Sequence, residues 1–156
     1  MTRRLRDVIS LMLGRAPLRT QVAALCRDPD TGDVLMITSR GTGRWIIPKG
    51  WPMYGRSHAQ SALQEAWEEA GVKGSVTDDE IGRYRYDKAE TSRDAVPVEA
   101  RVFPVMVTKL ADKFPEKGQR ERRWFHPVEA AELVAEDGLR RILMTLPPMG
   151  RRAAGE

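Results

Sequence analysis

One segment of the chain carries both the start and the stop signals of a helix. Ser57 and Gln60 have the spacing of a capping box, in which each side chain bonds to the other residue's backbone N–H. Gly71 stands where a helix commonly ends in a left-handed residue. This spacing predicts a helix over about 57–70, with one apolar stripe facing a sheet. The stripe consists of Ala59, Leu63, Ala66, Trp67 and Ala70.

Segments typical of strands lie on both sides of this helix. The apolar runs 20–27 and 33–40 are joined by the turn DPDTGD, which predicts a hairpin. After the helix, 81–88 and 98–110 alternate apolar and polar residues, and Pro104 indicates an edge strand or a bulge. The chain therefore alternates between strand and helix signals around one well-marked helix.

The last part of the chain adds a short strand, RRWFHP, and then one or two helices in PVEAAELV and GLRRILMTL. Together the elements predict an α/β sandwich with a mixed sheet. We expect a single domain over 1–156, in which 1–18 is an N-terminal extension with a short helix and 147–156 is a tail.

Composition limits the classes of function. Cys26 is the only cysteine, so no internal disulfide is available, and its apolar neighbours predict a buried thiol in a reducing cytoplasm. No apolar stretch approaches the roughly 20 residues of a membrane span. The net charge of +4 favours anionic partners in general. Nucleic acid is not expected as a partner, because no basic stripe with interleaved aromatic residues is present.

The predicted helix concentrates acid on the side opposite its apolar stripe. Glu65, Glu68 and Glu69 repel one another at helical spacing, and they lie near the C-terminus, where the helix dipole disfavours anions. A solvated helix face is the alternative interpretation of such a cluster. A divalent cation would remove the free-energy cost of the repulsion among the glutamates. Ligands that are all oxygen favour Mg²⁺, with Mn²⁺ as an alternative. We therefore predict a metal site whose carboxylates project outward together.

The segment 50–72 resembles the Nudix box, which has glycine, five residues, glutamate, seven residues, and then Arg-Glu-U-x-Glu-Glu-x-Gly-U, where U is aliphatic. The matching positions are Gly50, Glu65, Ala66, Glu68, Glu69, Gly71 and Val72. Two positions depart from the pattern: Arg56 stands at the first acidic position, and Gln64 replaces the arginine before the catalytic glutamate.

The resemblance covers roughly residues 20–135. RWIIPKGWPM, EEAGVKG and RRWFHPVEAAELV are similar to the diphosphoinositol polyphosphate phosphohydrolase branch, which includes diadenosine polyphosphate hydrolases. The resemblance implies the Nudix fold, an α/β/α sandwich with a mixed β-sheet. It also implies metal-dependent hydrolysis of a phosphoanhydride in a small anionic polyphosphate, either a dinucleoside polyphosphate or an inositol pyrophosphate.

The same resemblance assigns roles to the matching residues. Glu65 and Glu69 would be the principal metal ligands and catalytic carboxylates, and Glu68 would assist as a ligand or base. Gly50 would supply a backbone ligand or allow the loop to approach closely. Glu116 and Glu121 are candidates for a further carboxylate, although a solvated loop position is more common for each.

The two departures leave alternatives open. Gln64 can still form hydrogen bonds but brings no charge, so Gln64→Arg is expected to leave activity equal or higher. Arg56 could instead meet a substrate phosphate. A Nudix domain that binds nucleotides or polyphosphates without cleaving them is one alternative function. An RNA 5′-pyrophosphohydrolase, suggested by the basic charge, is another.

Several cations are candidates for holding substrate phosphates. Lys49 and Arg44 are the stronger candidates, because the box fixes their place beside the metal site. The full set is Arg40, Arg44, Lys49, Arg56, Arg120 and Arg122, of which Arg120 and Arg122 are implied by the resemblance to the diphosphoinositol branch. Trp51 and Tyr86 could stack on a base, whereas Trp45 is expected in the core. His58 is expected at the surface. The oligomeric state and the exact substrate are left open.

Overall fold

The structure is a computed structural model that describes Leu5 and residues 18–89 and 95–149. The helix predicted within 1–18 and most of the tail predicted at 147–156 lie outside the described residues. Among the described residues, no helix is long and apolar enough to cross a membrane.

The observed elements follow the predicted order. The strands are β1 (Arg19–Arg27), β2 (Val34–Thr38), β3 (Trp45–Ile46), β4 (Lys49–Gly50), β5 (Val72–Val76), β6 (Gly82–Ala89), β7 (Ala95–Leu110) and β8 (Arg122–Phe125). The helices with described bounds are α2 (His58–Ala70), α3 (Pro127–Leu133) and α4 (Asp137–Met144). The predicted hairpin is confirmed, since β1 and β2 pair antiparallel.

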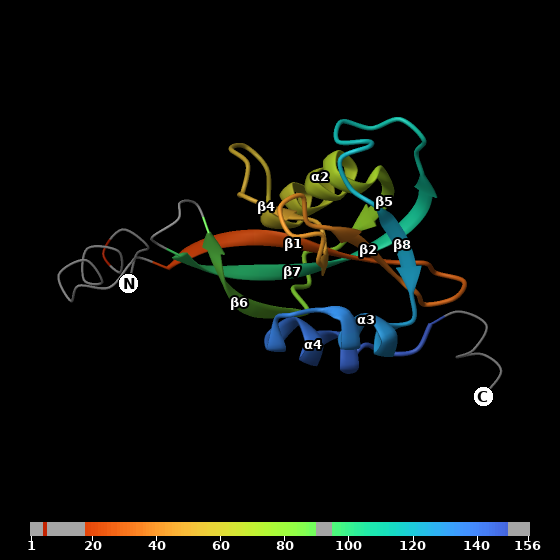
Figure 1. The fold of residues 1–156 in the computed structure, drawn as a ribbon. Helices are drawn as coiled ribbons and strands as arrows, with labels where there is room; N and C mark the ends of the chain where they lie inside the picture. Colours follow the sequence, from red (N-terminus) through yellow and green to blue (C-terminus); the bar gives the residue numbers. More distant parts are fainter. Residues whose placement is uncertain (1–4, 6–17, 90–94, 150–156) are drawn as a thin grey trace.

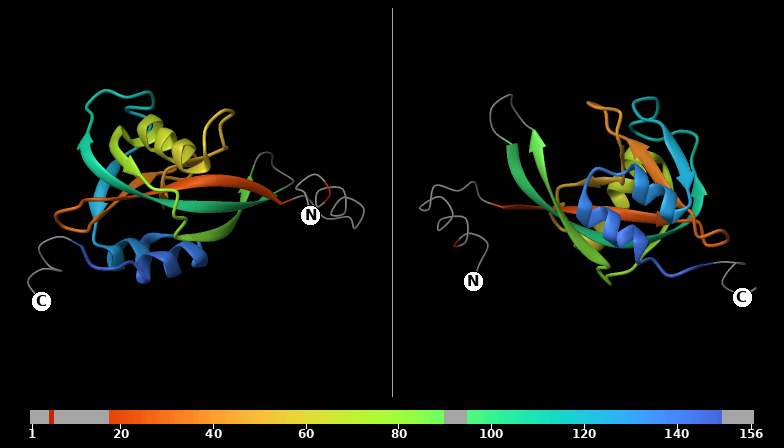
Figure 2. Two further views of the ribbon diagram at one scale, coloured as in Figure 1. Left: turned by 180° about the vertical axis from the view of Figure 1, so that it is seen from behind. Right: turned by 60° about the horizontal axis from the view of Figure 1, so that its bottom comes forward.

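The strands form one mixed sheet. Its main path is β3-β2-β1-β7-β5, with β4 paired to β1, β6 to β7 and β8 to β2. The pairing of β1 with β7 is parallel, and the other pairings are antiparallel. Helix α2 covers one face, and α3 and α4 cover the other (Figures 1 and 2). The predicted α/β/α sandwich with a mixed sheet is confirmed.

Strand β1 is buried on both faces, which explains its continuous apolar sequence. Val22, Ala24 and Cys26 belong to the core cluster under α2, whereas Ala23 and Leu25 belong to the cluster under α3 and α4. Burial raises the pKa of the Cys26 thiol far above its usual range. The prediction of a buried, unreactive cysteine is therefore confirmed.

Pro104 does not lie on an edge strand or in a bulge, so that prediction is wrong. It occupies the interior strand β7, opposite Leu25 of β1. On the other side of β7, pairing with β6 extends to Val102 and pairing with β5 begins at Val105. The proline is tolerated because it falls between two partner strands, where a missing N–H costs no ladder hydrogen bond.

The apolar stripe of α2 is centred differently from the prediction. Four alanines, Ala59, Ala62, Ala66 and Ala70, pack on the sheet. At about 100° per residue, Trp67 lies about 80° to one side of Ala59 and Glu69 about 80° to the other. Trp67 is half-buried beneath the Lys73 ammonium, 5.5 Å from its ring centroid, rather than in the core. Glu69, at the opposite edge of the stripe, is buried.

Candidate active site

The capping signals fix where α2 begins and ends. The Gln60 backbone N–H donates to Ser57 Oγ at 3.1 Å, and the Ser57 backbone N–H donates to Gln60 Oε1 at 3.0 Å. Gly71 ends the helix in the left-handed region, at φ 68°. Both predictions are confirmed. Because the two ends are fixed by local sequence, the positions of the glutamates around the helix are fixed as well.

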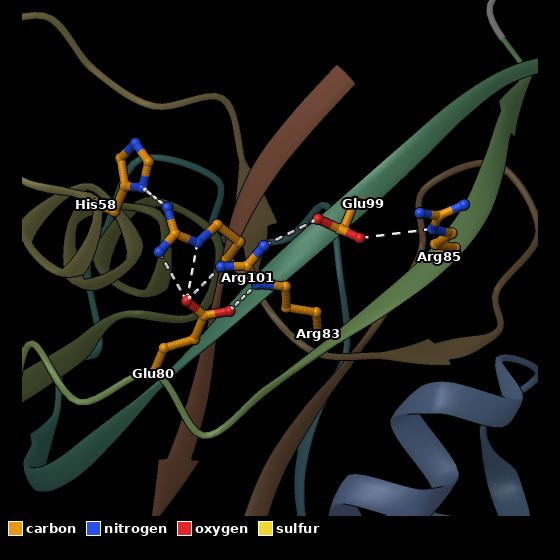
Figure 3. Close-up of polar contacts among 6 residues, drawn as sticks. All are labelled: His58, Glu80, Arg83, Arg85, Glu99 and Arg101. Atoms are coloured by element: carbon orange, nitrogen blue, oxygen red, sulfur yellow. Dashed lines mark hydrogen bonds and ion pairs between the residues drawn. The ribbon is translucent and has the colours of Figure 1, made fainter. Parts of the chain in front are cut away.

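A polar network holds the first residue of α2 against the sheet (Figure 3). Arg101 Nη1 donates to His58 Nδ1 at 2.8 Å, and Arg101 also forms an ion pair with Glu80 at 2.7 Å. Arg83 bonds to both Glu80 and Glu99, and Arg85 extends the network from Glu99. His58, expected at the surface, is half-buried in this network.

A cavity of about 530 Å³ opens between the C-terminal part of α2, strand β4 and the loop that precedes β8. Carboxylates, cations and aromatic rings share its walls. Its lining residues are Gln21, Ser39, Arg40, Gly41, Ile46, Lys49, Gly50, Trp51, Glu65, Glu69, Tyr86, Lys88, Glu116 and Arg120.

Gly50 permits the Glu65 side chain to lie directly against the backbone of β4. A Cβ placed on Gly50 would lie 2.2 Å from the Glu65 carboxyl carbon, which no side chain could tolerate. The close approach predicted for this glycine is therefore present. Burial, together with the nearby carboxylates of Glu69 and Glu68, raises the pKa of Glu65 to about 7.

Glu69 does not project outward as predicted, because it is only 5% exposed. Its Oε2 accepts from the Lys49 backbone N–H at 3.4 Å, and its Oε1 lies 3.6 Å from Arg120 Nη2. Burial outweighs the two neighbouring cations and raises the pKa of Glu69 to about 7. The carboxylate therefore faces a confined cavity rather than bulk water.

Glu116 supplies a third carboxylate from the loop before β8. Its backbone N–H donates to the Glu68 carbonyl at 2.9 Å, which fastens the loop along α2. Its side chain lines the cavity and forms an ion pair with Arg120 at 3.3 Å. Glu116 therefore lies in the wall of the cavity and not at the solvated position that is more common for a loop glutamate. Glu121 is exposed and lies outside the cavity lining.

Three of the six predicted phosphate-binding cations line the cavity. Arg120 is 9% exposed and also donates to the Thr38 carbonyl at 3.1 Å. Arg40 approaches Glu116 at 3.6 Å. Burial lowers the pKa of Lys49, and Glu69 and Glu136 oppose this effect. The cavity thus carries both positive and negative groups, which suits a ligand made of metal ions and phosphates.

The other three predicted cations lie elsewhere. Arg44 forms an ion pair with Glu136 at 3.6 Å and lines a different cavity. Arg122 donates to the Ala70 carbonyl at 2.8 Å and lies over the Phe114 ring. Arg56 donates to the Gln64 side chain at 2.9 Å. Glu68, predicted as a ligand or base, also lies outside the cavity lining, and Gln64 donates to it at 3.1 Å.

Two aromatic rings line the cavity, and each has a lysine ammonium near its face. Lys88 Nζ lies 5.0 Å from the centroid of Trp51, and Lys49 Nζ lies 5.1 Å from that of Tyr86. The Tyr86 hydroxyl donates to the Gln21 side chain. Trp45 packs edge-on against Phe125 instead and is absent from this lining.

The donor set fits a hard divalent cation in its chemistry. Glu65, Glu69 and Glu116 line the same cavity and offer only oxygen atoms, the ligands that such a cation prefers. Within the described part of the chain, however, no three acidic, histidine or cysteine side chains are already gathered at metal-ligand spacing. Binding a cation there would draw these carboxylates together.

Sequence reasoning did not single out Gln21, Lys88 or Glu136. Gln21 and Lys88 reach the cavity from the sheet strands β1 and β6, and Glu136 acts on Lys49 from the N-cap of α4. No local motif marks any of them, because their proximity arises only when the sheet and the last helices assemble.

Known proteins resemble this chain in sequence. A family model described as the NUDIX domain matches residues 17–146. The chain is 32% identical to Nudix hydrolase 12, mitochondrial, of Arabidopsis thaliana over 114 residues, covering 71% of this chain and 56% of that protein. It is 28% identical to diphosphoinositol polyphosphate phosphohydrolase 3-alpha of Mus musculus, covering 74% of this chain and 69% of that protein.

Solved structures share the fold at lower identity. A MutT protein from Methanosarcina mazei superposes with a TM-score of 0.61 at 22% identity, covering 83% of this chain and 92% of that one. The C. elegans Ap4A hydrolase gives a TM-score of 0.57 at 15% identity, covering 81% and 94%. The chain spans little more than half the length of the first curated relatives it matches.

Proposed function

Because the chain belongs to the Nudix hydrolase family, we propose that it hydrolyses a phosphoanhydride bond in a small anionic polyphosphate with the help of a divalent metal ion. The observation that carries the proposal is the cavity in which Glu65, Glu69 and Glu116 face Lys49, Arg40 and Arg120. Mg²⁺, or Mn²⁺ in its place, would be held by these carboxylates and would neutralise phosphate oxygens during attack by water.

The residues of the chain have separate tasks in this proposal. Arg40, Lys49 and Arg120 bind phosphate oxygens and orient the chain of phosphates along the cavity. Glu69, held by the Lys49 backbone N–H and by Arg120, keeps a fixed position on the helix. Partial burial of these groups strengthens each electrostatic contact.

The aromatic walls favour a dinucleoside polyphosphate over an inositol pyrophosphate. Trp51 offers a flat apolar surface beside the phosphate-binding cations, and a nucleobase can stack on it in place of the Lys88 ammonium, whereas an inositol ring cannot stack. Trp51→Ala is therefore expected to raise KM for diadenosine tetraphosphate about tenfold, the loss of one stacking contact. KM for an inositol pyrophosphate should stay near the wild-type value. Equal effects on both substrates would contradict the assignment.

The reaction itself is tested by measuring phosphate and nucleotide release with Mg²⁺ and with a chelator. The substrates are diadenosine tetra-, penta- and hexaphosphate, an inositol pyrophosphate, ADP-ribose and 5′-triphosphate RNA. Metal-dependent cleavage of one class supports the proposal. Tight binding of the panel without cleavage would show a binding domain instead.

Glu69→Gln links this activity to the cavity. In this variant kcat should fall by more than about 100-fold, which exceeds the loss expected when a hydrogen-bond partner of a metal ligand is removed. It should stay folded, because the amide oxygen can still accept from the Lys49 N–H. Glu121→Gln is the matched control, since Glu121 is exposed and outside the cavity, and it should behave like the wild type.

A further inference from the structure

The two positions at which this chain departs from the Nudix box contact each other. Arg56 Nη1 donates to Gln64 Oε1 at 2.9 Å. Gln64 Nε2 in turn donates to Glu68 Oε1 at 3.1 Å. Arg56 lies in the turn before α2, and the other two residues lie on successive turns of that helix. A continuous path of side-chain hydrogen bonds therefore runs from the arginine to a glutamate of the box.

The chemistry of the three groups allows only one orientation of the glutamine. A guanidinium can only donate, and an ionised carboxylate can only accept. Turning the Gln64 amide over would place its NH₂ group against Arg56 and its oxygen against Glu68, and both hydrogen bonds would be lost. Gln64 is therefore a polar connector with a fixed direction, and its dipole is aligned between the cation and the anion.

We infer that Arg56 and Gln64 form one positioning unit for Glu68, in which each departure compensates for the other. The box pattern has an acid at position 56 and a cation at position 64, whereas this chain has the cation at 56 and a neutral connector at 64. Glu68 lies outside the cavity lining, and it reaches the proposed metal ligands only through its neighbour Glu69 and through its carbonyl, which accepts from the Glu116 N–H. Its effect on metal binding is therefore indirect and rests on the proposed function.

The contact reverses the sequence-based expectation for Gln64→Arg. That change alone places a second guanidinium against Arg56, with no acceptor between them, so the two cations repel and the new guanidinium is not held in a fixed position beside Glu68. Arg56→Glu alone places a carboxylate against the Gln64 oxygen, and the connector can then satisfy only one of two acids. With both changes together, one guanidinium can donate to a carboxylate on each side.

A double-mutant cycle tests the unit on the full chain, with wild type, Arg56→Glu, Gln64→Arg and the double variant. The readouts are the urea midpoint of unfolding in EDTA, the Mn²⁺ dissociation constant, and kcat and KM separately. Each single variant should bind Mn²⁺ about 10-fold more weakly and lose a similar factor in kcat, as expected for loss of an outer hydrogen-bond partner. The double variant should recover most of both losses and of the unfolding midpoint.

Two controls separate positioning from general charge effects. Lys109→Glu makes the same charge change at an exposed site on β7, opposite Lys73, and it should leave the Mn²⁺ dissociation constant and kcat unchanged. Arg56→Lys keeps the charge and one donor, and it should stay closer to wild type than Arg56→Glu.

Additive effects of the two substitutions, or a Gln64→Arg variant equal to or better than wild type, would overturn the inference. If the wild type cleaves no substrate, the proposed function fails on its own. The unfolding midpoints in EDTA and the Mn²⁺ titrations still decide whether Arg56 and Gln64 are coupled, and additive values there would refute the unit.

Discussion

At the scale of single residues, the contact between Gly50 and Glu65 depends on the absence of one carbon atom. The carboxylate occupies the volume that a Cβ would fill, so its position follows from the backbone of β4 as much as from the helix that carries it. Any side chain at position 50 would push Glu65 away from Glu69 and from the cations across the cavity.

Gly50→Ala should therefore reduce metal affinity and kcat by about 10–100-fold, similar to the loss of a group that orients a metal ligand. Gly41→Ala is the matched control, because Gly41 lines the same cavity and a Cβ there would meet nothing within 4 Å. The Mn²⁺ dissociation constant and the melting temperature of both variants check the prediction. A Gly50→Ala protein with wild-type affinity would show that Glu65 is not held by this contact.

Residues of the site could be predicted where the resemblance to the Nudix box and the spacing along the helix place them. Gly50, Glu65 and Lys49 lie in the cavity because the capped helix and the strand before it are adjacent in sequence. Arg44 was also expected in the cavity, but it forms an ion pair with Glu136, a buried side chain at the N-cap of α4, and lies outside the cavity. The burial of Glu69 was missed because its edge of the helix becomes covered only when the alanine stripe packs on the sheet.

At the scale of elements, α2 is held at its N-terminus by a network that requires a neutral imidazole. His58 Nδ1 accepts from Arg101, and a protonated ring would instead place a second cation against that guanidinium. Burial and the positive charge of Arg101 lower the pKa of His58 below its ordinary value of 6.5, and Glu80 opposes this effect.

Since the pKa of His58 is lower in the folded protein, the unfolded chain binds more protons as the pH falls below about 6.5, and the folded state loses stability there. His58→Gln keeps an acceptor for Arg101 but does not titrate. As the pH is lowered from 7 to 5, the free energy of unfolding of the wild type should therefore fall more than that of His58→Gln. If urea unfolding showed the same pH dependence of stability for both proteins over that range, the role given to His58 would be contradicted.

At the scale of the whole molecule, the sandwich was predictable because each main layer has its own sequence pattern. The continuous apolar run of β1, the capped helix and the final apolar helices each mark one layer. Strand β5 was not predicted, since its five residues, VKGSV, carry little apolar periodicity and pair with β7 through a register shift at Lys73 and Gly74. The position of Pro104 could not be predicted either, because it depends on two strands that share one side of β7.

The whole fold should respond to metal, because the carboxylates of the cavity come from both α2 and the loop before β8. A cation that binds only the folded chain adds about 2.7 kcal/mol at a concentration of 100 Kd. The melting temperature should thus rise with Mg²⁺ or Mn²⁺ concentration and return with EDTA. Glu69→Gln should abolish most of this rise in melting temperature. If the variant showed the same rise as the wild type, the metal would bind outside this cavity.

The fastening of Glu116 to α2 by a single backbone hydrogen bond has a consequence for how such a protein can change over generations. Glu65 and Glu69 lie on α2, whose position is fixed by the alanines that pack on the sheet. The loop that carries Glu116 and Arg120 lies outside the two core clusters, and insertions in such segments are well tolerated. New chemical preferences can therefore arise by lengthening or rewriting this loop while the inherited scaffold persists, which makes the segment 111–121 the natural starting point for directed evolution.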